Sequence, residues 1–249
     1  MTITTRPRTT SPVPVNAYRR TALVVGLLFL VTYITSIPAK FVFYPPLLDN
    51  ADFILGGGSE TQVLWGAFAE VILIVANIGT AVALYPLLRR QQAGLAMGFV
   101  TARVMESVFI AVGVLSVLSV VTLRQDFAAT GGEDSAALAV VGDALVALQE
   151  WTFVLGPNFV VGVGNGLILG YLMYRSGLIP RGMAMLGMVA GTLIVLFGTA
   201  LIFGVVEQGS AWQAVLGAPE FVWELSFAIY LIAKGFKPSP LTTGTVHTS

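Results

Sequence analysis

The chain has 249 residues, of which 56% are hydrophobic and only 10% are charged, and its mean hydropathy is +0.85. This composition lies far outside the range of soluble domains and predicts a membrane protein. The 13 basic and 13 acidic side chains balance, and no basic face or aromatic platform indicates nucleic-acid binding. Cysteine is absent and the one histidine is His247, so zinc, haem, iron–sulfur and Ser-His-Asp sites lack their usual residues. We therefore expect no metal, no cofactor and no catalytic group of these kinds.

Residues 1–20 are rich in Thr, Pro and Arg, which predicts a short disordered cytoplasmic tail. Six hydrophobic runs follow, each close to the roughly 20 residues that a helix needs to cross ~30 Å of hydrocarbon. The runs are continuous, whereas the strands of a membrane barrel would alternate, so their backbone polar groups must be satisfied within helices. The sequence thus predicts an all-α, polytopic transmembrane helical bundle over 21–236, followed by a disordered cytoplasmic tail over 237–249. The six predicted spans are 22–38, 62–88, 95–121, 145–174, 182–206 and 217–233.

The first run follows two arginines, as the hydrophobic part of a signal peptide would. Ile37 is too bulky for the position three residues before a cut at Ala39, so we interpret this run as an uncleaved span.

Charged residues outside the runs segregate by side, which predicts the orientation. With the N-terminus in the cytoplasm, almost all basic residues fall inside and all acidic residues of the loops fall outside. The inside basic residues are Arg6, Arg8, Arg19, Arg20, Arg89, Arg90, Arg175, Arg181, Lys234 and Lys237. The outside acidic residues are Asp49, Asp52, Glu60, Asp126, Glu133, Asp134, Asp143, Glu207 and Glu220. We therefore predict a protein of the cell (cytoplasmic) membrane with both termini inside and the lipid bilayer as its surroundings.

The connecting segments add three expectations. The links at 89–94 and 175–181 are short, so the second and third spans, and the fourth and fifth, should be antiparallel neighbours. Segment 39–61 mixes aromatic residues with Pro and Gly, which suits the outer headgroup region. No internal repeat is visible, which disfavours a transporter built from inverted repeats.

With Glu220, at the start of the sixth span, assigned to the outer side, five charged residues lie within the predicted spans, namely Glu70, Arg103, Glu106, Glu150 and Glu224. They are candidates for function, because a charge at the bilayer centre costs a few kcal/mol or more and normally faces the bundle interior. At ~1.5 Å per residue, Glu224 lies about 15 Å from its cytoplasmic lysine, near the midplane. On the same rise, Arg103 and Glu106 lie roughly 20 and 24 Å from theirs, and Glu70 and Glu150 approach the outer boundary. These depths predict a polar cavity that opens outward and ends near Glu224.

Arg103 and Glu106 are three residues apart, so they share a helix face and can pair. Two interpretations stay open. The pair either serves only packing, or Arg103 holds an anionic group or Glu106 while another carboxylate binds a cation or carries protons. Glu70 and Asn77, seven residues apart, extend a polar stripe along the second span.

Glu150 and Glu224 differ in how easily they are explained without a function. Glu150 stands beside Trp151 at the expected interface, where simple solvation is the alternative. Glu224 has no basic residue within two turns of its own helix. At its depth, an ionised carboxylate needs a partner or takes up a proton.

The fourth span combines a proline with small and amide side chains. Pro157 removes a backbone hydrogen bond and predicts a kink, and Asn158 and Asn165 should face the same way. The glycines favour a ridge for close helix packing, with a broken-helix binding site as the alternative. The ridge is Gly162, Gly166 and Gly170, with Gly187 and Gly191 on the fifth span as its counterpart.

Several stretches resemble a bacterial multi-pass membrane family known as domain of unknown function 4386. They are Ala102-Arg103-Val104-Met105-Glu106, Leu155-Gly156-Pro157 with Asn165, the stretch 170–181 containing Tyr174-Arg175-Ser176 and Pro180-Arg181, and 219–226 followed by Lys234-Gly235-Phe236. The resemblance extends over residues 18–238. It implies a bacterial multi-pass membrane protein and carries no activity, substrate or cofactor with it.

Three functions remain open on the residues alone. The first is binding or transport of a small molecule, or proton-coupled transport, through the predicted cavity. Its candidate lining residues are Glu70, Asn77, Arg103, Glu106, Glu150, Asn158, Asn165 and Glu224. The second is a structural, sensory or accessory protein without transport. An intramembrane enzyme is disfavoured, because neither His nor Cys is available to activate a nucleophile.

Overall fold

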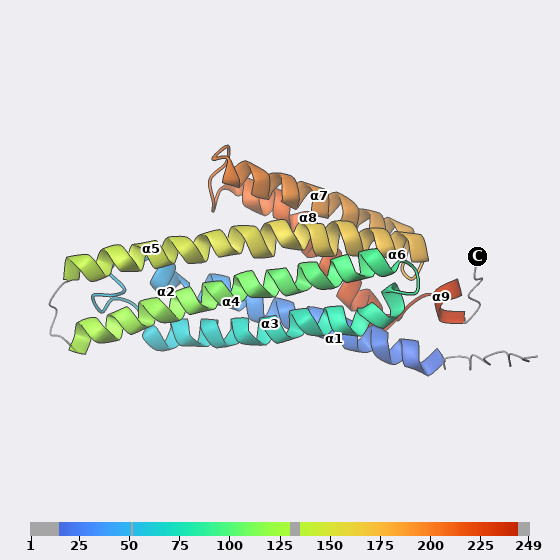
Figure 1. The fold of residues 1–249 in the computed structure, drawn as a ribbon, viewed down its shortest axis with the longest axis horizontal. Coiled ribbons are helices and arrows are strands. Elements are labelled where there is room, and N and C mark those ends of the chain that lie inside the picture. Colours follow the sequence, from blue (N-terminus) through green and yellow to red (C-terminus); the bar gives the residue numbers. More distant parts are fainter. Residues whose placement is uncertain (1–14, 51, 130–134, 244–249) are drawn as a thin grey trace, which may run out of the picture.

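The structure, a computed structural model, describes residues 15–50, 52–129 and 135–243. Within these ranges six helical segments are long and apolar enough to cross a membrane, which confirms the predicted all-α, six-span fold (Figure 1). Four spans are single α-helices: α3 (Glu60–Leu88), α4 (Ala93–Ala129), α7 (Arg181–Ile202) and α8 (Ala211–Ala233). The first span covers Tyr18–Leu48 and consists of α1 (Val15–Pro38), the π-helical turn η1 (Ala39–Phe43) and the short helix α2 (Pro45–Leu48). The fourth span is composite, consisting of α5 (Ser135–Phe153), the π-helical segments η2 (Val154–Val160) and η3 (Gly162–Leu169), and α6 (Gly170–Ser176).

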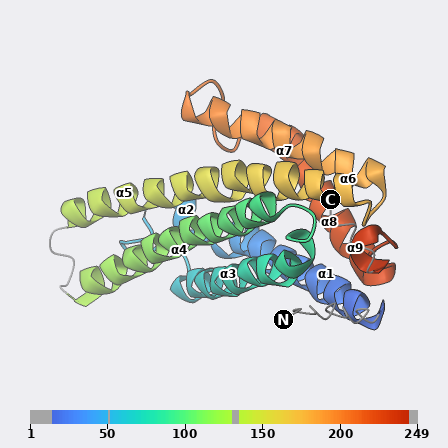
Figure 2. The same cartoon turned by 45° about the vertical axis from the view of Figure 1, so that its right-hand side comes forward.

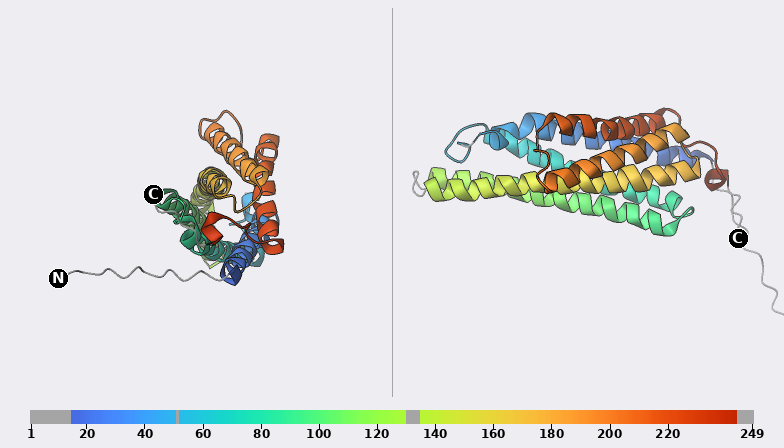
Figure 3. Two further views of the ribbon diagram at one scale, coloured as in Figure 1. Left: turned by 90° about the vertical axis from the view of Figure 1, so that its right-hand side faces the viewer. Right: turned by 90° about the horizontal axis from the view of Figure 1, so that it is seen from above.

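The six spans form a closed ring. α1 packs between α3 and α8, α4 packs between α3 and the fourth span, and α7 joins the fourth span to α8. Figure 2 shows α5 and α6 lying between α4 and α7, and Figure 3 shows the bundle end-on. The predicted antiparallel neighbours, α3 with α4 and α6 with α7, pack together. Because α1 and α8 also meet, the first and last spans close the ring around a common interior.

Both described ends of the chain lie at one end of the bundle. The Tyr18 hydroxyl donates to the Leu241 carbonyl oxygen at 3.2 Å and accepts from Arg90 Nη1 at 2.6 Å. The Lys237 amide donates to the Leu178 carbonyl oxygen at 2.7 Å. We call this the terminal end of the bundle. Residues 15–20 of the predicted N-terminal tail belong to α1, and 240–243 of the predicted C-terminal tail form the short helix α9 (Pro240–Thr243). Residues 1–14 and 244–249 of the two tails lie outside the described ranges.

The opposite end of the bundle carries a structured cap. α4 has 37 residues, about 55 Å at ~1.5 Å per residue, which exceeds the ~30 Å of the hydrocarbon. α4 and α5 thus project past α7 and α8 (Figure 1). The predicted third span ends at 121 and the predicted fourth span begins at 145, because the hydropathy of the sequence falls there. The helices α4 and α5 themselves continue beyond these limits.

Segment 39–61 folds onto this projection. It contains the π-helical turn η1 (Ala39–Phe43) and the short helix α2 (Pro45–Leu48). Its buried Tyr44 and Phe53 pack in one cluster with Val117 and Val120 of α4. Arg124 Nη1 donates to the Phe53 carbonyl oxygen at 2.9 Å. The segment is therefore packed against α4.

The fourth span runs without a break past Pro157. Residues 136–176 form one continuous helical span, in which the lost backbone bond at Pro157 coincides with π-helical winding in η2. A wider helical turn thus accommodates Pro157, at which the sequence predicted a kink, and the broken-helix alternative does not describe this span.

Close packing explains the glycines of the fourth and fifth spans. A Cβ atom on Gly191 would lie 2.5 Å from the Gly162 carbonyl oxygen and 2.7 Å from Gly166 Cα. A Cβ on Gly170 would lie 3.1 Å from the Met188 amide nitrogen. The two backbones are thus in direct contact. Gly187 differs from the expectation, because it faces the Trp223 ring of α8 and not the fourth span.

Candidate functional site

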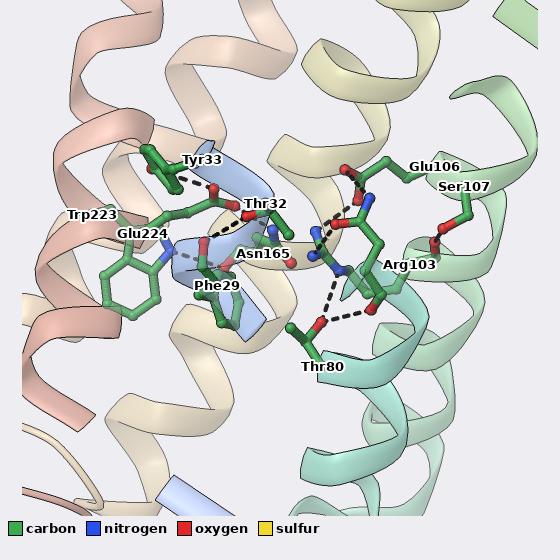
Figure 4. Close-up of polar contacts among 11 residues, drawn as sticks. Phe29, Thr32, Tyr33, Thr80, Arg103, Glu106, Ser107, Asn165, Trp223 and Glu224 are labelled. Atoms are coloured by element: carbon green, nitrogen blue, oxygen red, sulfur yellow. Dashed lines mark hydrogen bonds and ion pairs between the residues drawn. The ribbon is translucent and has the colours of Figure 1, made fainter. Parts of the chain in front are cut away.

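The interior of the ring holds a cavity of about 310 Å³, which we call the inner cavity. Side chains of α1, α3, α4, the fourth span, α7 and α8 line it. The predicted residues among them are Glu70, Asn77, Arg103, Glu106, Asn158 and Glu224. Figure 4 shows Arg103 with Glu106 on one side and Glu224 with Tyr33 on the other, with Asn165 between the two groups. The structure thus brings residues from distant parts of the chain into one polar interior.

Arg103 is held in a closed cycle of hydrogen bonds at one wall of the cavity. Its Nη1 donates to Glu106 Oε2 at 2.7 Å and its Nη2 donates to Asn77 Oδ1 at 2.6 Å. Asn77 Nδ2 completes the cycle by donating to Glu106 Oε1 at 2.9 Å. The Nε atom donates to Thr80 Oγ1 at 3.2 Å. All three charged or amide groups are buried, so the guanidinium charge is compensated where it stands, as burial requires.

Glu224 lies across the cavity from this cycle. Its Oε1 accepts from Asn165 Nδ2, and its Oε2 accepts from the Tyr33 hydroxyl over 3.5 Å. The hydroxyl bonds more closely to the Phe221 carbonyl oxygen, at 2.8 Å. Asn165 is fully buried, and its backbone carbonyl oxygen accepts from the Trp223 indole N–H at 3.2 Å. No basic side chain forms an ion pair with Glu224 among the described residues.

Glu220 belongs to this cavity, which corrects its assignment to the outer acidic residues. It is only 4% exposed, and neither of its carboxyl oxygens has a hydrogen-bond partner within the described part of the chain. It interacts electrostatically with Glu224, Glu106 and Arg103. Sorting charges by side placed it outside because it begins the predicted sixth span. The four-residue spacing from Glu224 was the missed signal, because residues i and i+4 share a helix face.

Further polar groups of the cavity come from α1, which contains none of the predicted site residues. Thr32, Tyr33 and Ser36 line it. A hydroxyl carries no formal charge, so only the spacing of 32 and 36 on one face was available as a signal.

A wider vestibule of about 810 Å³ adjoins the inner cavity on the side opposite the terminal end. The two spaces share Lys40, Phe153 and Gly217 as lining residues. Glu150 lines the vestibule and not the inner cavity. Gln208, Gly209 and Ser210 of the α7–α8 loop also border the vestibule. The vestibule therefore extends from the end of the bundle opposite the terminal end to the inner cavity.

Lys40 and Glu70 stand where the two spaces meet. The Lys40 ammonium lies 4.7 Å from the centre of the Phe153 ring and interacts electrostatically with Glu150, Glu70 and Asp49. Glu70 Oε2 accepts from the Tyr44 hydroxyl at 2.6 Å. The mouth therefore has its own compensated charges, separate from those at Glu220 and Glu224.

The chemistry of the inner cavity is that of an acidic site. Four carboxyl groups line it, against one guanidinium and one ammonium group. Arg103 and Lys40 are occupied by Glu106 and by the acids at the mouth. Within the described part of the chain, no basic group forms an ion pair with Glu220 or Glu224, and Arg103 acts on both only electrostatically. Such a wall can bind a positively charged group or a proton.

Comparisons with known proteins gave one match. Neither the curated proteins nor the solved structures contain a match to this chain. The profile of the family described as "Domain of unknown function (DUF4386)" matches residues 24–235. This range runs from within α1 to just beyond α8 and so includes the cavity and all six spans. The chain is thus a multi-pass membrane protein that belongs to the DUF4386 family.

Proposed function

We propose that this protein binds a small molecule in the inner cavity and carries it across the membrane, with protonation of a cavity carboxyl group coupled to transport. The observation that carries the proposal is the inner cavity itself, which lies between all six spans and is reached through the vestibule. A volume of about 310 Å³ is at the lower end of the ~300–1,000 Å³ of ordinary ligand pockets, so the ligand is small.

The placement of the carboxyl groups supports proton coupling. Glu224 faces Asn165 and Tyr33, both neutral. Ionisable groups inside a bundle mark ion and proton pathways in pumps and transporters. A carboxyl group with neutral partners can exist in either protonation state without breaking an ion pair, whereas Glu106 cannot lose its charge without leaving Arg103 uncompensated.

A structural, sensory or accessory role is the second candidate. The hydrogen-bond cycle of Arg103, Glu106 and Asn77 favours it, because a fully compensated cluster can simply tie α3 to α4. An intramembrane enzyme receives less support, since the carboxyl groups would have to supply both the acid and the base.

The first experiment screens purified protein in detergent for ligands that raise its melting temperature, using small cations, anions, zwitterions and neutral molecules. Ligands that do so are then tested for uptake into proteoliposomes with an imposed pH gradient. We expect saturable, gradient-dependent uptake by the unaltered protein and by Glu207→Gln, which changes an exposed loop acid. Glu224→Gln should melt normally and lose the dependence on the gradient.

The alternative outcome is equally specific. If no class of ligand stabilises the protein or enters the vesicles, and Arg103 variants fail only in folding, the accessory role replaces transport.

A further inference from the structure

The acids that line the inner cavity differ in whether the protein itself satisfies them. Glu106 is paired with Arg103, and Glu70 accepts from Tyr44 at the mouth. Glu224 accepts from two neutral groups. Glu220 is the exception, because it is buried, lines the cavity, and has no hydrogen-bond partner for either oxygen among the described residues. A buried carboxylate in this state is costly unless something else provides the donors.

The surroundings of Glu220 indicate what could provide them. Tyr33 and Phe221 form an aromatic pair at the cavity, with ring centres 5.0 Å apart. Phe153 lines the same space, and the Lys40 ammonium already lies over its ring. Aromatic faces next to a carboxylate are the usual surroundings of an organic ammonium group, which gains from both.

The other charged groups near the inner cavity do not remove this preference for an organic ammonium group. Among the residues that the structure describes, Arg103 is the one basic group that acts on Glu220, and it also acts on Glu106 and Glu224. Lys40 acts on Glu70, Glu150 and Asp49. No group of three His, Cys, Asp or Glu side chains within the described ranges is arranged to hold a metal ion. A ligand that brings its own N–H donors and apolar surface fits these walls better than a bare ion.

We propose that the inner cavity selects a small organic cation, and that Glu220 is its anchoring residue, with Glu224 and the aromatic rings of Tyr33, Phe153 and Phe221 completing the site. The inference rests on the proposed function, because it names the class of molecule that the proposed site takes. It adds a specific demand: the cavity must prefer positive over negative charge, and Glu220 must be the main cause.

The chain offers a clean test because it contains no cysteine. Gly217 lines both the vestibule and the inner cavity, and a Cβ atom there meets nothing within 4 Å. Gly217→Cys therefore places a unique thiol one helical turn from Glu220. Its rate of modification is measured with a cationic trimethylammonium-ethyl methanethiosulfonate and with an anionic sulfonatoethyl one. The same pair of rates at Val205→Cys, exposed in the α7–α8 loop, corrects for the intrinsic difference between the reagents.

We expect the corrected preference for the cationic reagent to be about tenfold or more, as expected for charges within ~10 Å in a partly dehydrated site. Adding Glu220→Gln to Gly217→Cys should reduce this preference severalfold, and adding Glu207→Gln should leave the preference unchanged. Benzylammonium should slow the cationic reagent at Gly217→Cys, whereas the neutral benzyl alcohol and the anionic benzoate should not.

Each other result overturns the inference in a distinguishable way. Equal corrected rates refute cation selection but leave transport of a neutral ligand intact, which the uptake experiment decides. A preference that survives Glu220→Gln refutes the anchoring role of Glu220. A thiol that reacts with neither reagent while Val205→Cys reacts refutes an accessible cavity, and with it the proposed function.

Discussion

Arg103 shows at the scale of one residue why a buried charge in this protein is tied to particular neighbours. Arg103 is 2% exposed, and its bonds to Glu106 and Asn77 close a cycle in which each of the three side chains contacts the other two. Removing the arginine alone leaves Glu106 buried without its cation. Removing both leaves no unpaired charge of the pair, and the neutral amide of Asn77 loses its partners.

We therefore predict that Arg103→Met lowers the free energy of unfolding by about 3–5 kcal/mol, and that the double variant Arg103→Met/Glu106→Met recovers most of this loss. Arg175→Met, at an exposed position, should change stability by less than ~0.5 kcal/mol. Reversible unfolding in mixed detergent micelles measures all three. A double variant as unstable as the single one would mean that the pair contributes more than charge compensation.

The comparison of Arg103 with Glu220 also shows which parts of the site the sequence predicts. The i, i+3 spacing of Arg103 and Glu106 is enough to predict their pairing, since both residues lie on one helix. The cycle needs Asn77 of α3, and its contact with α4 depends on how two helices pack. Glu220 was missed because charge sorting reads an acid at a helix start as a loop residue, and burial of that helix start depends on neighbours that are distant in the sequence.

At the scale of elements, glycine spacing determines how closely α7 approaches the fourth span. Gly191 touches the backbone of Gly162 and Gly166, and no side chain fits there. The spacing of four predicted this contact. It did not predict that Gly187, also on α7, faces Trp223, because a helix presents different faces to its two neighbours. Nor could Pro157 alone distinguish a kink from π-helical winding, since both accommodate the missing N–H.

Two glycines of α7, one in this contact and one outside it, allow a matched pair of substitutions. Gly191→Ala should destabilise the protein by about 1–3 kcal/mol, because its methyl group overlaps backbone atoms that have no rotamer to change. Gly182→Ala, where an added Cβ meets nothing within 4 Å, should be neutral or stabilising by up to ~1 kcal/mol, because alanine favours the helix. The difference in melting temperature between the two variants measures the contact. Equal melting temperatures would show that the α7 backbone can move away without cost.

At the scale of the whole molecule, the ring of six spans places most of its basic residues at two ends and keeps Arg103 in the interior. Arg19, Arg90, Arg175 and Arg181 lie on the segments that form the terminal end, while Lys40 and Arg124 lie toward the vestibule. Hydropathy predicts the number of spans, because each must cover the same thickness of hydrocarbon. It does not predict how the spans close into a ring, since that depends on small residues and polar contacts between helices.

The distribution of basic residues also predicts which end faces the cytoplasm, and with it the side from which a ligand enters the vestibule. The excess of Arg and Lys at the terminal end favours the cytoplasmic side for both termini. In intact cells, an impermeant thiol reagent should therefore label Val205→Cys in the α7–α8 loop and leave Gln92→Cys, exposed in the α3–α4 link, unlabelled until the cells are opened. Because the chain contains no cysteine, each variant reports one position. The reverse pattern would turn the vestibule toward the cytoplasm and make the inner cavity a site for ligands leaving the cell, whereas the expected pattern makes it a site for ligands that arrive from outside.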